Sequence, residues 1–505
     1  MIDLKYGASG QGRRDDAAMR RFRSHRVGQF IHWGLYSLPA GRWEGKDVEF
    51  AAEFLPRVAK IPQQRWEALA NDFTLADFDA DRWADTAVAL GARYMTITTK
   101  HHDGFCLWPS AHTDFHMGNT PSGRDVLGEL VAAYEARGID VNFYYSVLDW
   151  RHPDWRFTVE NDGDRAAFAR YLDFAMKQLE ELADRYPGVK GFWFDGTWDE
   201  SVKANGWWTW EVERMLKERL PGVVVNSRLR ADDFGSRHVD SNGQLMGDYE
   251  SGYERRLPGP WDVAVASRDW EACMTIPQAS WGYHQGPWAQ STLKHPWDVV
   301  DMMAHCTSLG GNFLLNFGPR GDGSMAPEEV EIASRVGEWL AVNGEAIYGC
   351  GYAEDWKYPG WGYYTQDGDT GQVYAVVTRI PASERVRIEV PGGQELAGLR
   401  LLGSGSISGQ DLEEGPGSVL GSAAPAGSGG YPFKRLAESV VEVELAAGPA
   451  ADAASGSGMP GGGVPGGGSA AAGSLAAFGP LVFALETRAV DPSGREKEPN
   501  PDVLD

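Results

Sequence analysis

The feature that most constrains the fold is a regular alternation of short apolar runs and longer amphipathic stretches over the first ~345 residues. The runs that have the length and composition of strands are 29–33, 93–99, 141–145, 191–195, 223–226 and 312–317. Helical spacing of apolar residues separates them, as in 125–137, 165–185, 207–219 and 297–309. Strands that alternate with helices form parallel sheets. Repetition over about 300 residues favours a (β/α)8-like barrel of the α/β class over an open sheet, although only six strands are evident.

The pattern changes near residue 349, where strand-like runs follow one another without helices between them. This change predicts a C-terminal antiparallel β-sandwich. Sequence rich in Gly, Ala and Ser interrupts it, most clearly at 459–469, and such composition indicates flexible loops because it cannot bury a core. We therefore predict three parts, which are a catalytic barrel over 1–348, a β-sandwich with flexible insertions over 349–490, and a polar tail over 491–505.

Composition excludes several classes of partner. The formal net charge of −24 disfavours nucleic acid and anionic membrane surfaces. No apolar run approaches the ~20 residues of a membrane span. The N-terminus lacks the apolar segment of a signal peptide, and four scattered cysteines fit a reducing compartment, so we expect a cytoplasmic protein. The oligomeric state is left open by the sequence.

Polar residues stand where the predicted strands end. In a (β/α) barrel the carboxyl ends of the strands form the active site. This rule selects the strand ends His32-Trp33, Lys100-His101-His102-Asp103, Tyr144-Tyr145, Trp193-Phe194-Asp195 and Asn226-Ser227-Arg228. Asp195 follows an apolar strand, and from the residues alone it is either a nucleophile or a capping residue. Glycoside hydrolysis needs a second carboxyl group, which the acid-rich segment 247–254, predicted to be a loop, can supply.

The adjacent histidines His101 and His102 raise the question of a metal. Neighbouring side chains on a strand point to opposite faces, so the two do not readily bind one ion. The sequence has no HExxH motif and no HxH motif after the first strand. We therefore predict no metal and no cofactor. Neutral imidazoles that bind sugar hydroxyls fit better, and buried structural histidines remain the alternative.

Taken together, these residues resemble the α-L-fucosidases of glycoside hydrolase family 29. The resemblance extends from Phe30 to Gly349. The motifs that carry it lie at 30–37, 98–109, 144–150, 193–195, 226–228, 269–275, 280–283 and 310–319. It implies a retaining exo-α-L-fucosidase that removes terminal α-L-fucosyl residues from an oligosaccharide or glycoside through a covalent fucosyl-enzyme.

The resemblance also assigns roles to residues. Asp195 is the expected nucleophile, and Arg228 is expected beside the acid/base. The residues expected to bind or enclose the sugar are His32, His101, His102, Tyr144 and Trp193. Glu53 corresponds to the family's sugar-binding glutamate, with Phe54 in place of the usual tryptophan, and Glu49 is the second choice.

The acid/base is less well defined by the sequence. Glu254 is preferred because it keeps the family's spacing to Leu257-Pro258. Glu250 and Glu271 are alternatives. Three other functions remain open, which are a retaining glycosidase for a similar sugar such as a galactoside, a non-catalytic carbohydrate-binding relative, and a metal-dependent barrel hydrolase.

Overall fold

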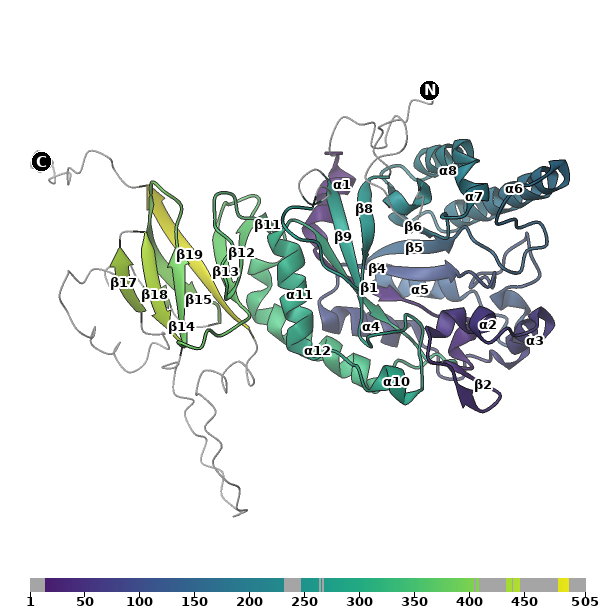
Figure 1. Cartoon of the computed structure of the whole chain (residues 1–505), viewed down its shortest axis with the longest axis horizontal. Helices are drawn as coiled ribbons and strands as arrows, with labels where there is room; N and C mark the ends of the chain where they lie inside the picture. The colour runs from purple at the N-terminus through teal and green to yellow at the C-terminus, as the bar shows by residue number, and fades with distance from the viewer. Residues whose placement is uncertain are drawn as a thin grey trace, which may run out of the picture. The chain divides into compact units, whose positions relative to one another are not determined.

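The structure is a computed structural model that describes residues 14–230, 247–262, 265, 268–403, 406–407, 433–437, 439–445 and 480–489. The chain divides into two compact units, Met1–Gly351 and Tyr352–Asp505. Figure 1 shows the elements of both units. The Gly/Ala-rich stretch 459–469 and the tail 491–505, for which we made predictions, lie outside the described residues.

The first unit is an eight-stranded parallel barrel, as predicted. Its strands follow the order β7-β6-β5-β4-β1-β10-β9-β8. Their bounds are β1 Val27–Ile31, β4 Tyr94–Lys100, β5 Asp140–Ser146, β6 Gly191–Asp195, β7 Val224–Val225, β8 Tyr249–Glu254, β9 Asp269–Thr275 and β10 Asn312–Phe317. A single parallel bridge between Asn226 and Tyr249 joins the two edge strands. The barrel is therefore nearly closed, with a narrow seam between β7 and β8.

Two strands escaped the sequence analysis. The acid-rich segment expected to be a loop contains β8, which has a register irregularity between Glu250 and Tyr253. Its acidic residues and Gly252 interrupt the run of apolar residues by which a buried strand is recognised. In β9 all seven residues are buried, including Asp269 and Glu271. Acidic residues on a buried strand break the apolar run by which such strands are recognised.

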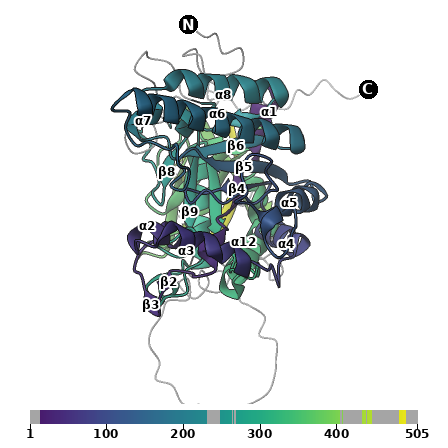
Figure 2. The same ribbon diagram turned by 90° about the vertical axis from the view of Figure 1, so that its right-hand side faces the viewer.

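Helices surround the barrel. The main ones are α4 Ala80–Leu90, α5 Val126–Glu135, α6 Asp162–Arg185, α8 Gly206–Arg219, α11 Pro296–Ser308 and α12 Pro327–Asn343. Helices α6 and α8 contact each other and lie side by side in Figure 2. On another part of the barrel, α5 contacts α4, α4 contacts α12, and α12 contacts α11. Pro296 and Pro327 begin their helices at the position where a missing N–H costs nothing. Within the described residues, no helix combines the length and apolarity needed to cross a membrane.

The connection from β1 to α4 is long and covers part of the barrel's carboxyl end. Its elements are β2 Arg42–Trp43, β3 Lys46–Asp47, the 3₁₀ helix η2 Ala52–Phe54, α2 Leu55–Val58 and α3 Gln63–Glu67. Two more short helices, α7 Glu200–Lys203 and α10 Pro287–Gln290, follow later strands. Of these additions, η2 contributes Glu53 and Phe54 to the pocket described below, and α10 contributes Trp288.

One apolar side chain from each strand fills the barrel. The residues in this cluster are Phe30, Tyr94, Tyr144, Trp193, Val224, Tyr249, Cys273 and Leu314. Met19 and Phe22, from α1 (Ala17–His25), pack against the same cluster. The barrel is thus a packed core and not a pore, as parallel barrels of this size are.

The second unit is a two-sheet antiparallel structure, as predicted. A six-stranded sheet has the order β11-β12-β13-β19-β15-β16, and a three-stranded sheet has the order β14-β18-β17. The strands are β11 Cys350–Tyr352, β12 Gly362–Asp367, β13 Val373–Val377, β14 Arg385–Glu389, β15 Gln394–Leu401, β16 Ser406–Ile407, β17 Phe433–Ala437, β18 Val440–Glu444 and β19 Leu481–Ala489. Inward residues of both sheets, such as Ile388, Val441 and Phe483, form one core.

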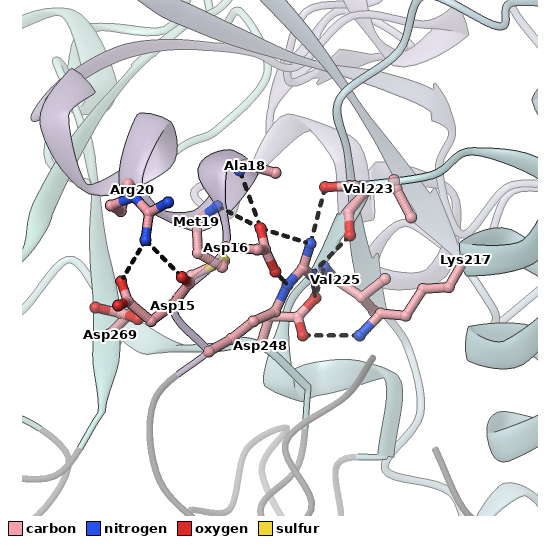
Figure 3. Close-up of polar contacts among 12 residues, drawn as sticks. Asp15, Asp16, Ala18, Met19, Arg20, Lys217, Val223, Val225, Asp248 and Asp269 are labelled. Atoms are coloured by element: carbon pink, nitrogen blue, oxygen red, sulfur yellow. Dashed lines mark hydrogen bonds and ion pairs between the residues drawn. The ribbon is translucent and has the colours of Figure 1, made fainter. Parts of the chain in front are cut away.

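Buried charged side chains stabilise the seam between β7 and β8, where a single bridge pairs the backbones. The Asp248 carboxylate, whose side chain is fully buried, accepts hydrogen bonds from Lys217 Nζ at 2.7 Å, Arg14 Nη1 at 2.9 Å and the Val225 backbone N–H at 2.9 Å. Figure 3 shows Asp248 and Lys217 joined beside Val225. Gly247 precedes this residue with φ of 66°, and a Cβ there would lie 2.5 Å from the Asn226 carbonyl. The seam therefore depends on a glycine for close approach and on a buried carboxylate for charge balance.

Replacement of Asp248 by Asn should lower the free energy of unfolding by about 3 kcal/mol, because two largely buried cations lose their shared counter-charge. Urea unfolding followed by fluorescence measures the change. The matched control is Asp173→Asn, which breaks the exposed pair with Lys177 and should cost about 0.5 kcal/mol or less. Equal losses in the two variants would show that the seam does not depend on Asp248.

Candidate active site

A pocket of about 680 Å³ opens at the carboxyl end of the barrel. This volume suits a small ligand. The sequence-selected residues that line it are His32, Glu53, His101, His102, Tyr144, Trp193, Asp195, Arg228 and Glu254. Residues from segments more than 200 positions apart thus meet in one cavity.

Asp195 ends β6 and is held by three neighbours. The Tyr144 hydroxyl donates to Asp195 Oδ2 at 2.8 Å, His102 Nε2 lies 3.6 Å from the same oxygen, and Arg228 Nη2 contacts Oδ1. Burial acts to raise the pKa of Asp195, but the Arg228 guanidinium and His102 hold it below the ordinary aspartate value. The pocket therefore contains a buried aspartate that stays ionised.

Glu254 ends β8 and faces the same guanidinium. Arg228 Nη1 contacts Glu254 Oε1 while Nη2 contacts Asp195, and the guanidinium lies 5.0 Å from the Trp193 ring centroid. Burial raises the pKa of Glu254 against the pull of Arg228, and the charge of Asp195 adds to the rise. Two carboxyl groups with pKa values shifted in opposite directions are the usual signature of a proton donor beside a permanent carboxylate.

The three histidines are neutral near pH 7. Burial lowers the pKa of His32 to about 3 and that of His102 to about 4, and it also lowers the pKa of His101. His32 Nδ1 lies 2.6 Å from Asn316 Oδ1, and His102 Nδ1 lies 2.6 Å from Ser146 Oγ. His32 and His102 are thus each oriented through Nδ1, which leaves His32 Nε2 for a ligand and places His102 Nε2 near Asp195.

Glu53 occupies the wall formed by η2. Its Oε2 accepts a hydrogen bond from the Gly282 backbone N–H at 3.0 Å, and burial raises its pKa to about 7. Among the described residues, Glu53 Oε1 and His101 Nδ1 are buried polar atoms without a partner. Such atoms in a pocket wall indicate a ligand that carries hydrogen-bonding groups. Glu49, the second choice from sequence, is exposed and does not line the pocket.

The other two candidate acids lie outside the pocket lining. Glu250 is buried, where it accepts hydrogen bonds from the Gly252 N–H at 2.7 Å and Ser227 Oγ at 3.2 Å. Glu271 lies inside the barrel, where Tyr94 Oη donates to it at 2.6 Å and Trp193 Nε1 at 3.1 Å. Burial raises the pKa of Glu271 to about 7. Glu271 therefore supports the Trp193 indole from below.

Sequence reasoning missed several pocket residues. The unassigned lining residues include Phe30, Phe50, Trp198, Arg255, Trp281 and Trp288. Trp281 stacks on His32 with ring centroids 5.1 Å apart, and its place in the motif 280–283 was the one available signal. Phe50, Trp198 and Arg255 lie in loops beyond strand ends and Trp288 lies in the short helix α10, where sequence offers no rule for which side chain turns inward. Within the described part of the chain, no group of three or more His, Cys, Asp and Glu residues is arranged to hold a metal ion.

A barrel pocket with two such carboxyl groups is the site of a glycoside hydrolase. The family model for α-L-fucosidase matches residues 3–345. Tissue α-L-fucosidase of Rattus norvegicus is 31% identical over 407 residues, which cover 76% of this chain and 81% of that protein. A crystal structure of a family 29 α-L-fucosidase from Bacteroides thetaiotaomicron has 46% identity and a TM-score of 0.80, covering 97% of this chain and 99% of that one.

A second structure from Bacteroides thetaiotaomicron is a covalent intermediate trapped with 2-fluoro-fucosyl fluoride in a glutamate-to-glutamine mutant. It has 45% identity and a TM-score of 0.80, and the match covers 97% of this chain and 100% of that one. The chain belongs to the α-L-fucosidase family, glycoside hydrolase family 29.

Glu271→Gln should make the protein more stable at high pH, relative to the wild type. Burial raises the folded-state pKa of Glu271 to about 7, against about 4.3 in an unfolded chain. The wild type therefore loses stability as pH rises between these values, whereas glutamine carries no proton to lose. Between pH 5 and pH 8 the stability difference should move by about 2 kcal/mol in favour of Glu271→Gln.

Urea midpoints at the two pH values measure this shift. Glu338→Gln, which removes an exposed carboxylate on α12, matches the change in net charge. A stability difference that stays constant with pH would mean that Glu271 is ionised in the folded protein, contrary to its burial.

Proposed function

We propose that this protein is a retaining exo-α-L-fucosidase in which Asp195 is the nucleophile and Glu254 is the general acid/base. The observation that carries the proposal is the Arg228 guanidinium, which contacts both carboxyl groups at once. A retaining pair stands roughly 5–5.5 Å apart, close enough for direct attack on the sugar. One planar cation between two carboxyl groups supports that short separation.

The pocket suits one terminal fucosyl residue. Neutral imidazoles of His32, His101 and His102 and the partnerless oxygen of Glu53 face a ligand that offers hydroxyl groups. The rings of Phe54 and Trp281 supply apolar surface in the same cavity for a methyl group and the ring carbons of the sugar. The substrate class we propose is therefore fucosylated oligosaccharides and glycosides.

In the first step a carboxylate oxygen of Asp195 attacks the anomeric carbon while Glu254 gives its proton to the glycosidic oxygen. The bond from the anomeric carbon to the leaving group breaks, and an ester with Asp195 forms. The raised pKa of Glu254 keeps its proton available, and the lowered pKa of Asp195 keeps the nucleophile ionised. The Tyr144 hydroxyl and Arg228 orient Asp195 for the attack.

In the second step Glu254 acts as a base. Ester formation removes the negative charge of Asp195, which lowers the pKa of Glu254. Glu254 then takes a proton from water, whose oxygen attacks the anomeric carbon, and the ester bond to Asp195 breaks. Fucose leaves with its original anomeric configuration, because each step inverts that carbon once.

Proton NMR of the sugar first released from an aryl α-L-fucoside should show α-L-fucose, before mutarotation. Asp195→Ala should lose nearly all turnover, on the order of 10⁴-fold or more, because no group remains to form the ester. An aryl galactoside tested in parallel gives the sugar preference. Appearance of β-L-fucose first would exclude the retaining mechanism.

Glu254→Ala should lose turnover of substrates with poor leaving groups far more than turnover of activated aryl fucosides, since only the former need protonation. Azide should accelerate the variant on an activated fucoside and yield fucosyl azide of retained configuration. Glu250→Ala is the matched control, because Glu250 lies nearby but outside the pocket lining. If azide rescues Glu250→Ala and not Glu254→Ala, the acid/base role belongs to Glu250.

A further inference from the structure

Arg255 lines the pocket directly after the proposed acid/base. Consecutive residues of an extended strand point to opposite faces, yet the side chains of Glu254 and Arg255 line the same cavity. The reason is the backbone of Arg255, whose φ of 51° lies in the left-handed region and whose N–H donates to the Cys273 carbonyl at 2.9 Å. A non-glycine residue in this region is strained, and such strain gathers at functional sites.

Among the described residues, the Arg255 guanidinium forms no hydrogen bond or close ion pair with a carboxylate, and the nearby acids that its charge affects are Glu254 and Glu53. The guanidinium carbon lies 5.8 Å from the centroid of the Trp281 ring. Arg228, the other arginine of the pocket, is shared between Asp195 and Glu254. Arg255 is thus an exposed cation at the pocket, whose charge lowers the pKa of Glu254 and of Glu53 but which forms no close ion pair among the described residues.

A second cation strengthens the positive field. Lys294 Nζ donates to the Thr275 carbonyl at 2.6 Å. Burial lowers the pKa of Lys294, the charge of Arg255 lowers it further, and the nearby Asp298 carboxylate raises it in part. Two cations near each other favour an anion between or beside them. This local field stands out in a chain whose net charge is −24.

Aromatic rings accompany the cation at the pocket. Phe50 is 47% exposed, and Trp198 and Trp288 are half-buried, and all three line the cavity. Because Glu254 must reach the glycosidic oxygen, the leaving group lies next to Glu254 and hence to Arg255. Flat rings suit the face of a sugar or aryl ring, and a guanidinium suits carboxylate or sulfate.

Resting on the proposed function, we propose that Arg255 belongs to a leaving-group subsite that selects fucosides whose aglycone carries a carboxylate or sulfate group. The cation binds the anionic substituent, and the aromatic rings bind the ring that bears it. Arg255 is then a specificity residue for the leaving group, and it takes no part in bond making or breaking.

The test compares two aryl α-L-fucosides of matched reactivity. One is 3-carboxy-4-nitrophenyl fucoside, and the other is its neutral N-methylamide. The ratio of their kcat/KM values is measured for the wild type, Arg255→Gln, Arg255→Lys and Arg256→Gln. Arg256 is the matched control, because it is exposed, stacks on Tyr253 and does not line the pocket.

We expect Arg255→Gln to lower the ratio about fivefold, the effect of one partly exposed ion pair. Arg255→Lys should retain most of the preference and Arg256→Gln all of it. High salt should reduce the wild-type ratio toward that of Arg255→Gln. The same pattern with a 3-sulfate in place of the carboxylate would extend the subsite to both anions.

Other results overturn the proposal. If Arg255→Gln slows both substrates by one factor and shifts the basic limb of the pH profile, Arg255 acts on Glu254 and not on the leaving group. An equal loss of preference in Arg256→Gln would indicate a general surface field. A wild type that hydrolyses neither fucoside overturns the fucosidase assignment and this inference with it, whereas hydrolysis without preference overturns this inference alone.

Discussion

Closure of the barrel between β7 and β8 is the constraint on which the site depends. Asp195 ends β6 and Glu254 ends β8, and in an open sheet of the same strand order the six strand spacings between them would amount to about 29 Å. Because the bridge from Asn226 to Tyr249 joins β7 to β8, only two strand spacings separate β6 from β8 across the seam. The Asn226 side chain reinforces this closure, because it forms hydrogen bonds with the Phe194 backbone in β6 and with Ser251 Oγ in β8. The pairing of the two carboxyl groups is therefore a consequence of sheet topology.

Arg228 contacts both of the carboxyl groups that barrel closure brings together. A single guanidinium between two carboxyl groups cannot stabilise both negative charges equally, because burial penalises each additional charge. Asp195 has the additional support of Tyr144 and His102 and keeps its charge, whereas the pKa of Glu254 rises. The difference between the two carboxyl groups thus arises from the other side chains that contact them and not from the residue types alone.

The pocket floor and the barrel core are the same layer of side chains. Phe30, Tyr144 and Trp193 belong to the buried cluster and also line the pocket. Glu271 was a catalytic candidate by sequence. In the structure it lies beneath these rings and accepts a hydrogen bond from Trp193, so it supports the pocket floor. Residues of this uppermost layer serve stability and the site together, because inward side chains of an eight-stranded barrel stack in layers and the last layer faces the pocket.

The sequence by itself determined the alternating pattern, six of the eight barrel strands, the change to β-structure near residue 349, and the nucleophile candidate at the end of a strand, because all of these are local or periodic features. Only the tertiary structure decided which of Glu254, Glu250 and Glu271 shares a pocket with Asp195. The three stand within 22 positions of one another, and their fates depend on a register irregularity in β8 and on a left-handed residue after it. Side-chain direction at a strand end is set by contacts with distant strands, which no local pattern records.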